Sequence, residues 1–228
     1  MNNDKKLITE YAVAKMIIYA EIMKQRGLTD NCLEELENYI ELFQTSELGI
    51  KYEIKLQQDI PNAIVVYTED NENDVKLLVI NLKIDYSKKC TDFEFVIPRN
   101  NGYRIESYVY TLLESVFSQR CSSCVQPLFE LMCLLKNVNI DFKTLKRLYD
   151  DEYSHANEIE DNIEHLSRAA NSYKYAWFNN LYTLGIKEKT SREFNIALAT
   201  AYSFVFRLRG MQSANYWSHT ELLWITLD

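Results

Sequence analysis

The chain contains few of the residues that interrupt regular structure. Only 5 of its 228 residues are glycine and 3 are proline, well below the average usage of about 7% and 5%. Little of the chain can therefore be linker or low-complexity sequence, and we expect nearly all of it to be ordered. The scattered glycines do not assemble into a Walker loop or a Gly-x-Gly-x-x-Gly loop, so we do not expect nucleotide binding through such a loop.

Long apolar runs and a paired set of cysteines are missing as well. No apolar run approaches 18 residues and the first residues are polar, so we expect neither a membrane span nor a signal peptide. Five cysteines are an odd number, which indicates reduced thiols in a cytoplasmic protein. Cys121 and Cys124 have the spacing of a zinc or redox motif, but no second pair or nearby histidine completes four zinc ligands. We therefore expect no metal and no cofactor.

Basic residues are fewer than acidic ones, 25 against 33, and the formal net charge is -8. Such a charge repels nucleic acid and anionic lipid on average, so we expect nucleic acid only as part of a larger complex. The basic residues near the C-terminal end, such as Lys187 and Arg207, are interpreted as a surface face. The many Asn, Ile, Lys and Tyr residues indicate an AT-rich genome, viral or microbial.

Hydrophobic residues make up 47% of the chain, and the period of their spacing changes along it. Helical spacing covers residues 4–26 and a second helix that follows Asp30. From residue 50 the period becomes two, and four apolar runs at 52–56, 63–67, 77–84 and 93–97 predict four strands. Their short connections favour an antiparallel meander.

Helical spacing returns after Pro98 and predicts helices at 105–120, 128–135, about 141–184 and 190–210. The expected fold class is α+β: mostly helical, with one small four-stranded antiparallel sheet and a long helix in a C-terminal helical hairpin. We expect an α+β domain over residues 1–137 and a helical region over 138–228. For residues 217–227, periodicity does not decide between helix and strand.

The stretch from Asp141 to Gly185 is the most distinctive. Its apolar residues recur at alternating steps of four and three, with only Glu152 out of character, which predicts one apolar seam on a single helix. The residues of this seam are Leu145, Tyr149, Ala156, Ile159, Ile163, Leu166, Ala170, Tyr173 and Trp177. Such a helix would be about 60 Å long, so we expect several other segments or a partner to cover the seam.

The same stretch holds carboxylates and imidazoles at helical spacing, namely Glu152, His155, Glu158, Asp161 and His165. Residues three and four apart lie close enough to share a metal ion. Carboxylate-bridged di-metal bundles resemble this arrangement, but they use Glu-x-x-His twice and this chain offers it once. Because further acids crowd the region, we interpret it as a solvated face rather than a metal site.

Two resemblances arise in the first half of the chain. The order helix, four strands and helices over residues 31–137 resembles the RWD-type α+β fold, a docking module, although the Tyr-Pro-x-x-x-Pro turn of that family is absent. The 61–83 hairpin, with Asn62, Asn81 and Lys83, resembles the metal-binding hairpin of restriction-endonuclease-like nucleases. That resemblance implies a site without catalysis, because both acid positions are amides and Mg²⁺ needs hard oxygen ligands.

Aromatic residues gather in the final quarter, and they are more than one helical seam can bury. Tryptophan and tyrosine recur in binding hot spots. We therefore predict binding residues among them, while the alternative that all of them pack inside the monomer stays open. The predicted binding residues are Trp177, Phe178, Tyr182, Trp217 and Trp224.

No complete catalytic constellation is present in the sequence. The expected function is therefore non-enzymatic: a protein-protein interaction or scaffold subunit of a larger assembly, which docks through the long helix and the aromatic C-terminal hairpin. The expected partner is another protein or another copy of the chain, and no membrane. The alternative function is a nuclease-like, inactive, nucleic-acid-associated protein that uses the 61–83 hairpin.

Overall fold

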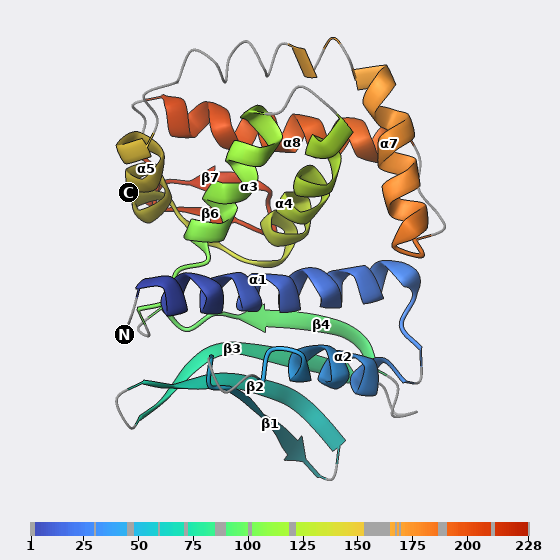
Figure 1. The fold of residues 1–228 in the computed structure, drawn as a ribbon, viewed down its shortest axis with the longest axis vertical. Helices are drawn as coiled ribbons and strands as arrows, with labels where there is room; N and C mark the ends of the chain where they lie inside the picture. The colour runs from blue at the N-terminus through green and yellow to red at the C-terminus, as the bar shows by residue number, and fades with distance from the viewer. Residues whose placement is uncertain are drawn as a thin grey trace. The chain divides into compact units, whose positions relative to one another are not determined.

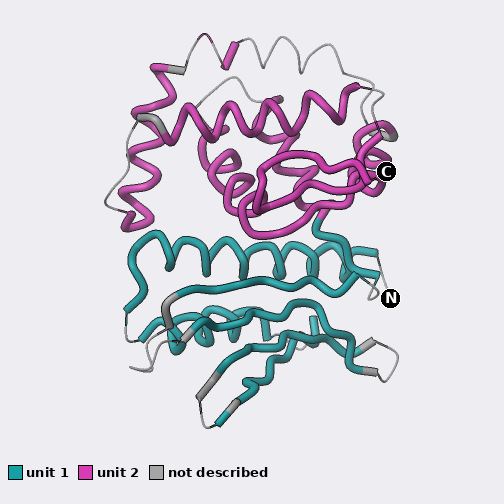
Figure 2. The backbone as a smooth tube through the Cα atoms, turned by 180° about the vertical axis from the view of Figure 1, so that it is seen from behind, with its two compact units in different colours: residues 1–105 teal, residues 106–228 magenta. Residues whose placement is uncertain are grey.

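The computed structural model confirms the α+β class and divides the chain into two compact units, residues 1–105 and 106–228 (Figure 2). The expected boundary at residue 137 differs from this division, which falls after Ile105. The structure describes residues 3–29, 31–44, 48–58, 60–70, 73–84, 90–99, 102–118, 122–152, 165, 166, 168, 170–186, 191–210 and 213–227.

The described part of the first unit contains two α-helices and a four-stranded sheet (Figure 1). The sheet has the order β1-β2-β3-β4 and every neighbouring pair is antiparallel, so the predicted meander is confirmed. The elements are α1 (Asn3–Arg26), α2 (Cys32–Glu41), β1 (Ile50–Gln57), β2 (Ile60–Asp70), β3 (Asn73–Ile84) and β4 (Cys90–Val96). Asp30, the expected cap of α2, lies outside the described residues.

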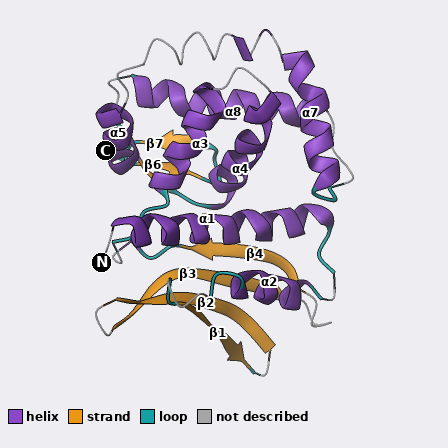
Figure 3. Cartoon of the chain, viewed as in Figure 1, coloured by secondary structure: helices purple, strands orange, loops and turns teal. Residues whose placement is uncertain are grey.

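Helix α1 runs alongside β4 (Figure 3) and is joined to it by an ion pair. Lys24 Nζ lies 2.8 Å from Asp92 Oδ1. Burial alone would raise the pKa of the Asp92 carboxyl, but hydrogen bonds from Lys24 and the backbone N–H of Phe93, with the nearby lysine charges, lower that pKa below its usual value. The carboxylate therefore stays ionised and holds the two elements together at neutral pH.

The second unit packs helices around a small sheet. Its helices are α3 (Glu106–Ser118), the 3-10 helix η2 (Ser122–Cys124), α4 (Val125–Asn137), α5 (Phe142–Glu152), α7 (Ala170–Thr183) and α8 (Ser191–Arg209). Its strands are β5 (Ile140–Asp141), β6 (Tyr216–Ser218) and β7 (Leu223–Ile225), in the order β5-β6-β7. The C-terminal segment is thus a hairpin of two short strands. Helix α3 packs on α4 and α5, which explains why both α3 and α4 belong to this unit.

The prediction of one straight helix over 141–184 is wrong. Phe142 at the start of α5 stacks edge-on against Trp224, which stacks on Phe204 in α8, while Trp177 in α7 contacts Phe194 near the other end of α8. The ring separations, the ring-to-backbone distances and ten residues of α8 place the Cα atoms of residues 142 and 177 at most roughly 47 Å apart, whereas a straight helix would separate them by about 52 Å. Accordingly, α5 and α7 lie at opposite ends of α8 (Figure 1). Residues 153–164 lie outside the described residues, and antiparallel pairing of α7 with α8 stays a prediction.

The single-helix prediction fails because two separate parts of the second unit cover the apolar seam. Leu145 and Tyr149 of α5 are buried, and so are Tyr173 and Trp177 of α7. Helix α5 packs on α3 and α8, whereas α7 packs on α4 and α8. The described seam residues therefore need no partner to cover them. No helix in the described ranges is long and apolar enough to cross a membrane.

Candidate interaction surface

Trp217 and Trp224 belong to the core of the second unit. They lie directly opposite each other across the β6–β7 pair, with ring centroids 5.7 Å apart. Phe204 packs against both rings, and Phe142 against Trp224. We call Phe142, Phe204, Trp217 and Trp224 the aromatic box. Both tryptophans are buried, so the expectation that they lie on a surface is wrong.

The indole N–H groups explain why two tryptophans can be buried here. Trp217 Nε1 donates a hydrogen bond to the backbone carbonyl of Leu135, and Trp224 Nε1 donates to that of Phe204, both at 2.9 Å. A buried indole without an acceptor would cost free energy, and these bonds remove that cost. Trp177 is also buried, between the rings of Phe129 and Phe194.

Helix α7 carries a second set of rings on the side away from Trp177. Tyr175 is 74% exposed and Tyr182 is 83% exposed, while Phe178 between them is half-buried. Steps of three and four residues place these three rings on one helical face. The structure therefore brings together two of the predicted binding residues, Phe178 and Tyr182, with Tyr175, which we had not singled out. The three-and-four spacing from Tyr175 could have identified it.

The neighbouring positions on α7 are polar but almost uncharged. Asn171, Asn179 and Thr183 are exposed beside them. Lys174 is the one charged residue of α7, and its ammonium lies 3.1 Å from Oδ1 of Asn171. We call Tyr175, Phe178 and Tyr182, with Asn171 and Asn179, the α7 aromatic face. Aromatic enrichment and depletion of charge are the composition found at the centre of protein interfaces.

The 61–83 hairpin is an antiparallel pair of β2 and β3, and its resemblance to the nuclease hairpin stays a prediction. Asn81 lies directly across from Ala63, and Asn62 occupies the extra position where the β1–β2 register shifts. Lys83 Nζ lies 4.0 Å from Oδ2 of Asp92 on the neighbouring strand β4. In the described part of the chain, no three His, Cys, Asp or Glu residues lie together as metal ligands.

The candidate metal residues of the Asp141–Gly185 stretch lie largely outside the described residues. This applies to His155, Glu158 and Asp161, and the side chain of Glu152 is likewise not described. His165 is exposed, and its Nε2 lies 3.4 Å from the hydroxyl of Tyr173. The structure therefore gives no test of metal binding by this set.

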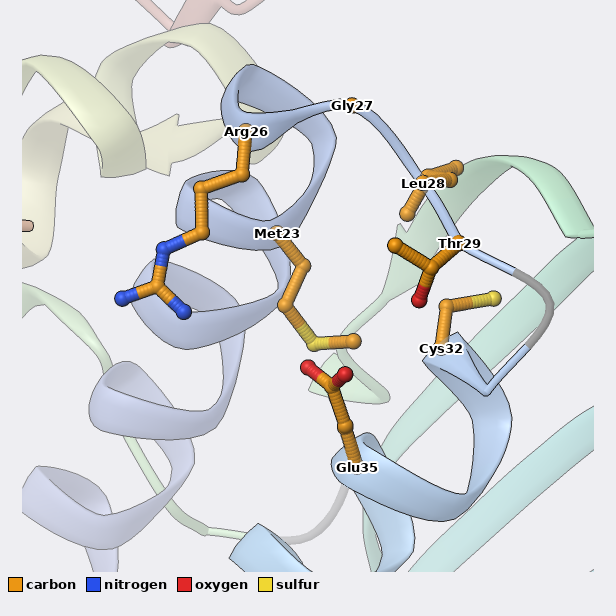
Figure 4. Close-up of a pocket in the computed structure, with 7 residues that line it drawn as sticks. All are labelled: Met23, Arg26, Gly27, Leu28, Thr29, Cys32 and Glu35. Carbon is orange, nitrogen blue, oxygen red and sulfur yellow. The ribbon is translucent and has the colours of Figure 1, made fainter. Parts of the chain in front are cut away.

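A small hollow of about 190 Å³ lies between the end of α1 and the start of α2 (Figure 4). Gly27, with a φ of 88°, makes the turn that separates the two helices. Cys32 supplies a buried thiol that is not in a disulfide, and Arg26 and Glu35 supply one charge of each sign. No histidine lines the hollow, so it lacks the base that would activate a thiol as a nucleophile.

A second, shallower hollow lies along α5. Lys143, Lys146, Arg147 and Asp150 line it at helical spacing, beside residues 213 and 214. Lys146 is paired with Asp150 and lies over the ring of Tyr149. This is an exposed helix face of mixed charge, with an excess of cations.

The chain matches no protein-family model, and no curated protein and no solved structure matches it.

Proposed function

We propose that the chain is a non-enzymatic interaction protein, or scaffold subunit of a larger assembly, which binds a protein partner through the α7 aromatic face. One observation carries the proposal: α7 has aromatic residues on two sides, and the chain itself covers only one of them. Trp177 is 4% exposed, whereas Tyr182 is 83% exposed. A surface helix of a globular protein normally presents a polar outer side.

The size of the exposed rings supports a binding role. A buried tyrosine or phenylalanine removes about 150–250 Å² from water, and burial contributes about 25 cal/mol per Å² of apolar area. Two or three such rings on one helix face can therefore contribute several kcal/mol to association. Single exposed aromatics are ordinary, but three at contact spacing with one nearby charge form a contiguous patch.

The residue types of the α7 aromatic face favour binding over catalysis. The face offers rings, amides and one adjacent ammonium group, and it includes no carboxylate, imidazole or thiol. General acid–base or nucleophilic catalysis needs such groups within hydrogen-bond reach of one another. Tyrosine and asparagine instead combine contact area with adaptable hydrogen bonding, as in binding loops.

A photo-crosslinking experiment tests the proposal. A photoreactive phenylalanine analogue at position 182 should form a covalent adduct with a partner protein in an extract of the source organism. The matched control carries the analogue at Phe206, which is 76% exposed on α8. We expect adducts from position 182 that are absent from position 206 and that disappear when Tyr175→Ser is added. Identical adducts from both positions, or none from position 182, would contradict the proposal.

A further inference from the structure

The two edges of the four-stranded sheet differ in what flanks them. The β4 edge has α1 beside it, and the Lys24–Asp92 ion pair joins the two. The β1 edge is the outermost strand on the other side (Figures 1 and 3), and no described element of the first unit lies beyond it. An open edge presents backbone N–H and C=O groups that can pair with another strand.

Strand β1 is regular over its whole length, which suits it for such pairing. Its eight residues, Ile50–Gln57, contain no bulge. The β1–β2 register shifts at Asn62 of β2, which has no partner residue in β1. A bulge in β1 would have twisted the edge away from a new strand. The bulge belongs to the inner strand, so the outer ladder of β1 remains uniform.

The solvent face of β1 carries alternating charges. Lys51, Glu53 and Lys55 are all exposed. Lys51 is paired with Glu69 on β2. Glu53 and Lys55, in contrast, have no ion pair within the described ranges. Lysines alone would repel a second copy of the strand and protect the edge. A glutamate two residues before a lysine instead makes the strand complementary to itself when it is reversed.

The opposite face of β1 is apolar and incompletely covered. Tyr52 and Ile54 are half-buried, and Leu56 is 62% exposed. These three side chains continue the buried face of the sheet to its edge. The exposed area of Leu56 would be covered if the sheet extended by one more strand.

We infer that this edge pairs with a second copy of the chain: β1 adds antiparallel to β1 of the second copy, about a two-fold axis at Ile54. In this register Glu53 lies opposite Lys55 of the second copy, and Leu56 lies opposite Tyr52 of the second copy. The symmetry repeats both contacts, and the two sheets become one of eight strands. The interface is isologous and closes at two copies.

Other registers satisfy these side chains less well. Centring on Glu53 would oppose Glu53 to itself and Lys51 to Lys55, and centring on Lys55 would oppose Lys55 to itself. Centring on Tyr52 would use Lys51, which is already paired with Glu69, and would leave Leu56 beyond the end of the ladder. Shifts by one residue would place the apolar face of one copy against the charged face of the other.

Charge reversal with rescue tests this inference on the full chain. Light scattering and sedimentation over roughly 1 µM to 1 mM, the range that resolves micromolar to millimolar dissociation constants, should show a monomer–dimer equilibrium. Glu53→Lys opposes like charges at both symmetric contacts and should weaken dimerisation at least about tenfold. The double variant Glu53→Lys/Lys55→Glu restores opposite charges and should return the dissociation constant to within about threefold of the unmodified chain.

Two controls separate this surface from other effects. Lys76→Gln, at an exposed position on the inner strand β3, removes a lysine charge away from this edge and should leave dimerisation unchanged, as should Tyr182→Ser on α7. Backbone amides of β1 should exchange hydrogen more slowly at high protein concentration, and Glu53→Lys should abolish that protection. A chain that stays monomeric over the whole range overturns the inference. A dimer that is insensitive to Glu53→Lys, or not rescued by the double variant, also overturns it.

Discussion

The aromatic box and the α7 aromatic face use the same residue types for opposite purposes. In the aromatic box Trp217 is fully buried, and its ring centroid lies 4.9 Å from that of Phe204. Its indole N–H donates a hydrogen bond to the backbone carbonyl of Leu135. On the α7 aromatic face Tyr175 and Tyr182 are mostly exposed. The difference shows that a high density of aromatics does not identify a surface. The side of the helix or strand on which each ring stands decides whether it stabilises the fold or remains available to a partner.

The largest expected effect is on the aromatic box. Trp217→Ala should lower the free energy of unfolding by about 3–5 kcal/mol, because it leaves a cavity beside the rings of Phe204 and Trp224 and removes the hydrogen bond to Leu135. Urea unfolding followed by circular dichroism measures this change. A loss below about 1 kcal/mol, the range of ordinary surface substitutions and weak contacts, would show that the box is not the centre of the second unit.

A smaller effect is expected at Glu106, whose side chain fixes the position of strand β5. The buried carboxylate of Glu106 accepts a hydrogen bond from the backbone N–H of Asp141 at 2.7 Å, and Ile140 next to it pairs with Trp217. Glu106→Ala should therefore cost about 1–3 kcal/mol, because the partly buried N–H of Asp141 loses its acceptor. The near-ultraviolet circular dichroism of the tryptophans should weaken as well. Glu114→Ala, an exposed position on the same helix, serves as the control and should change stability by less than about 0.5 kcal/mol.

Much of the fold could be predicted because its signals are local. The spacing of apolar residues and the glycine after residue 26 gave α1, and the change to period two gave all four strands of the meander. Asp141, where the sequence places the start of a helix, caps α5, because its Oδ1 accepts a hydrogen bond from the backbone N–H of Thr144 at 2.7 Å. Each of these features depends on neighbours within one turn or one strand pair.

The features that failed depend on contacts between distant segments. Steps of three and four residues describe one face of a helix, and they do not say whether two such stretches share an axis, so α5 and α7 were joined in error. Strands β6 and β7 have three residues each, too few for a period to be read. The burial of Trp217 depends on Leu135, 82 residues earlier in the chain, which no local pattern contains.

The candidate site was predicted in part for the same reason. Phe178 and Tyr182 were named from aromatic density, and they are half-buried and exposed respectively. Trp177 was named by the same criterion and is covered by Phe129 and Phe194, which come from two other helices. Sequence spacing shows that residues 178 and 182 share a face, but only the packing of α7 shows which face the chain leaves uncovered.

The smallest effect on stability is expected at Tyr182 on the α7 aromatic face. Tyr182→Ala removes a ring that is 83% exposed, so the free energy of unfolding should change by less than about 0.5 kcal/mol. Leu181→Ala, at the adjacent buried position, should cost about 2–5 kcal/mol. Urea unfolding of the two variants measures both values with the same helix and the same neighbours. Equal losses at the two positions would mean that the chain itself covers both sides of α7, and the aromatic residues there would then belong to the core like those of the aromatic box.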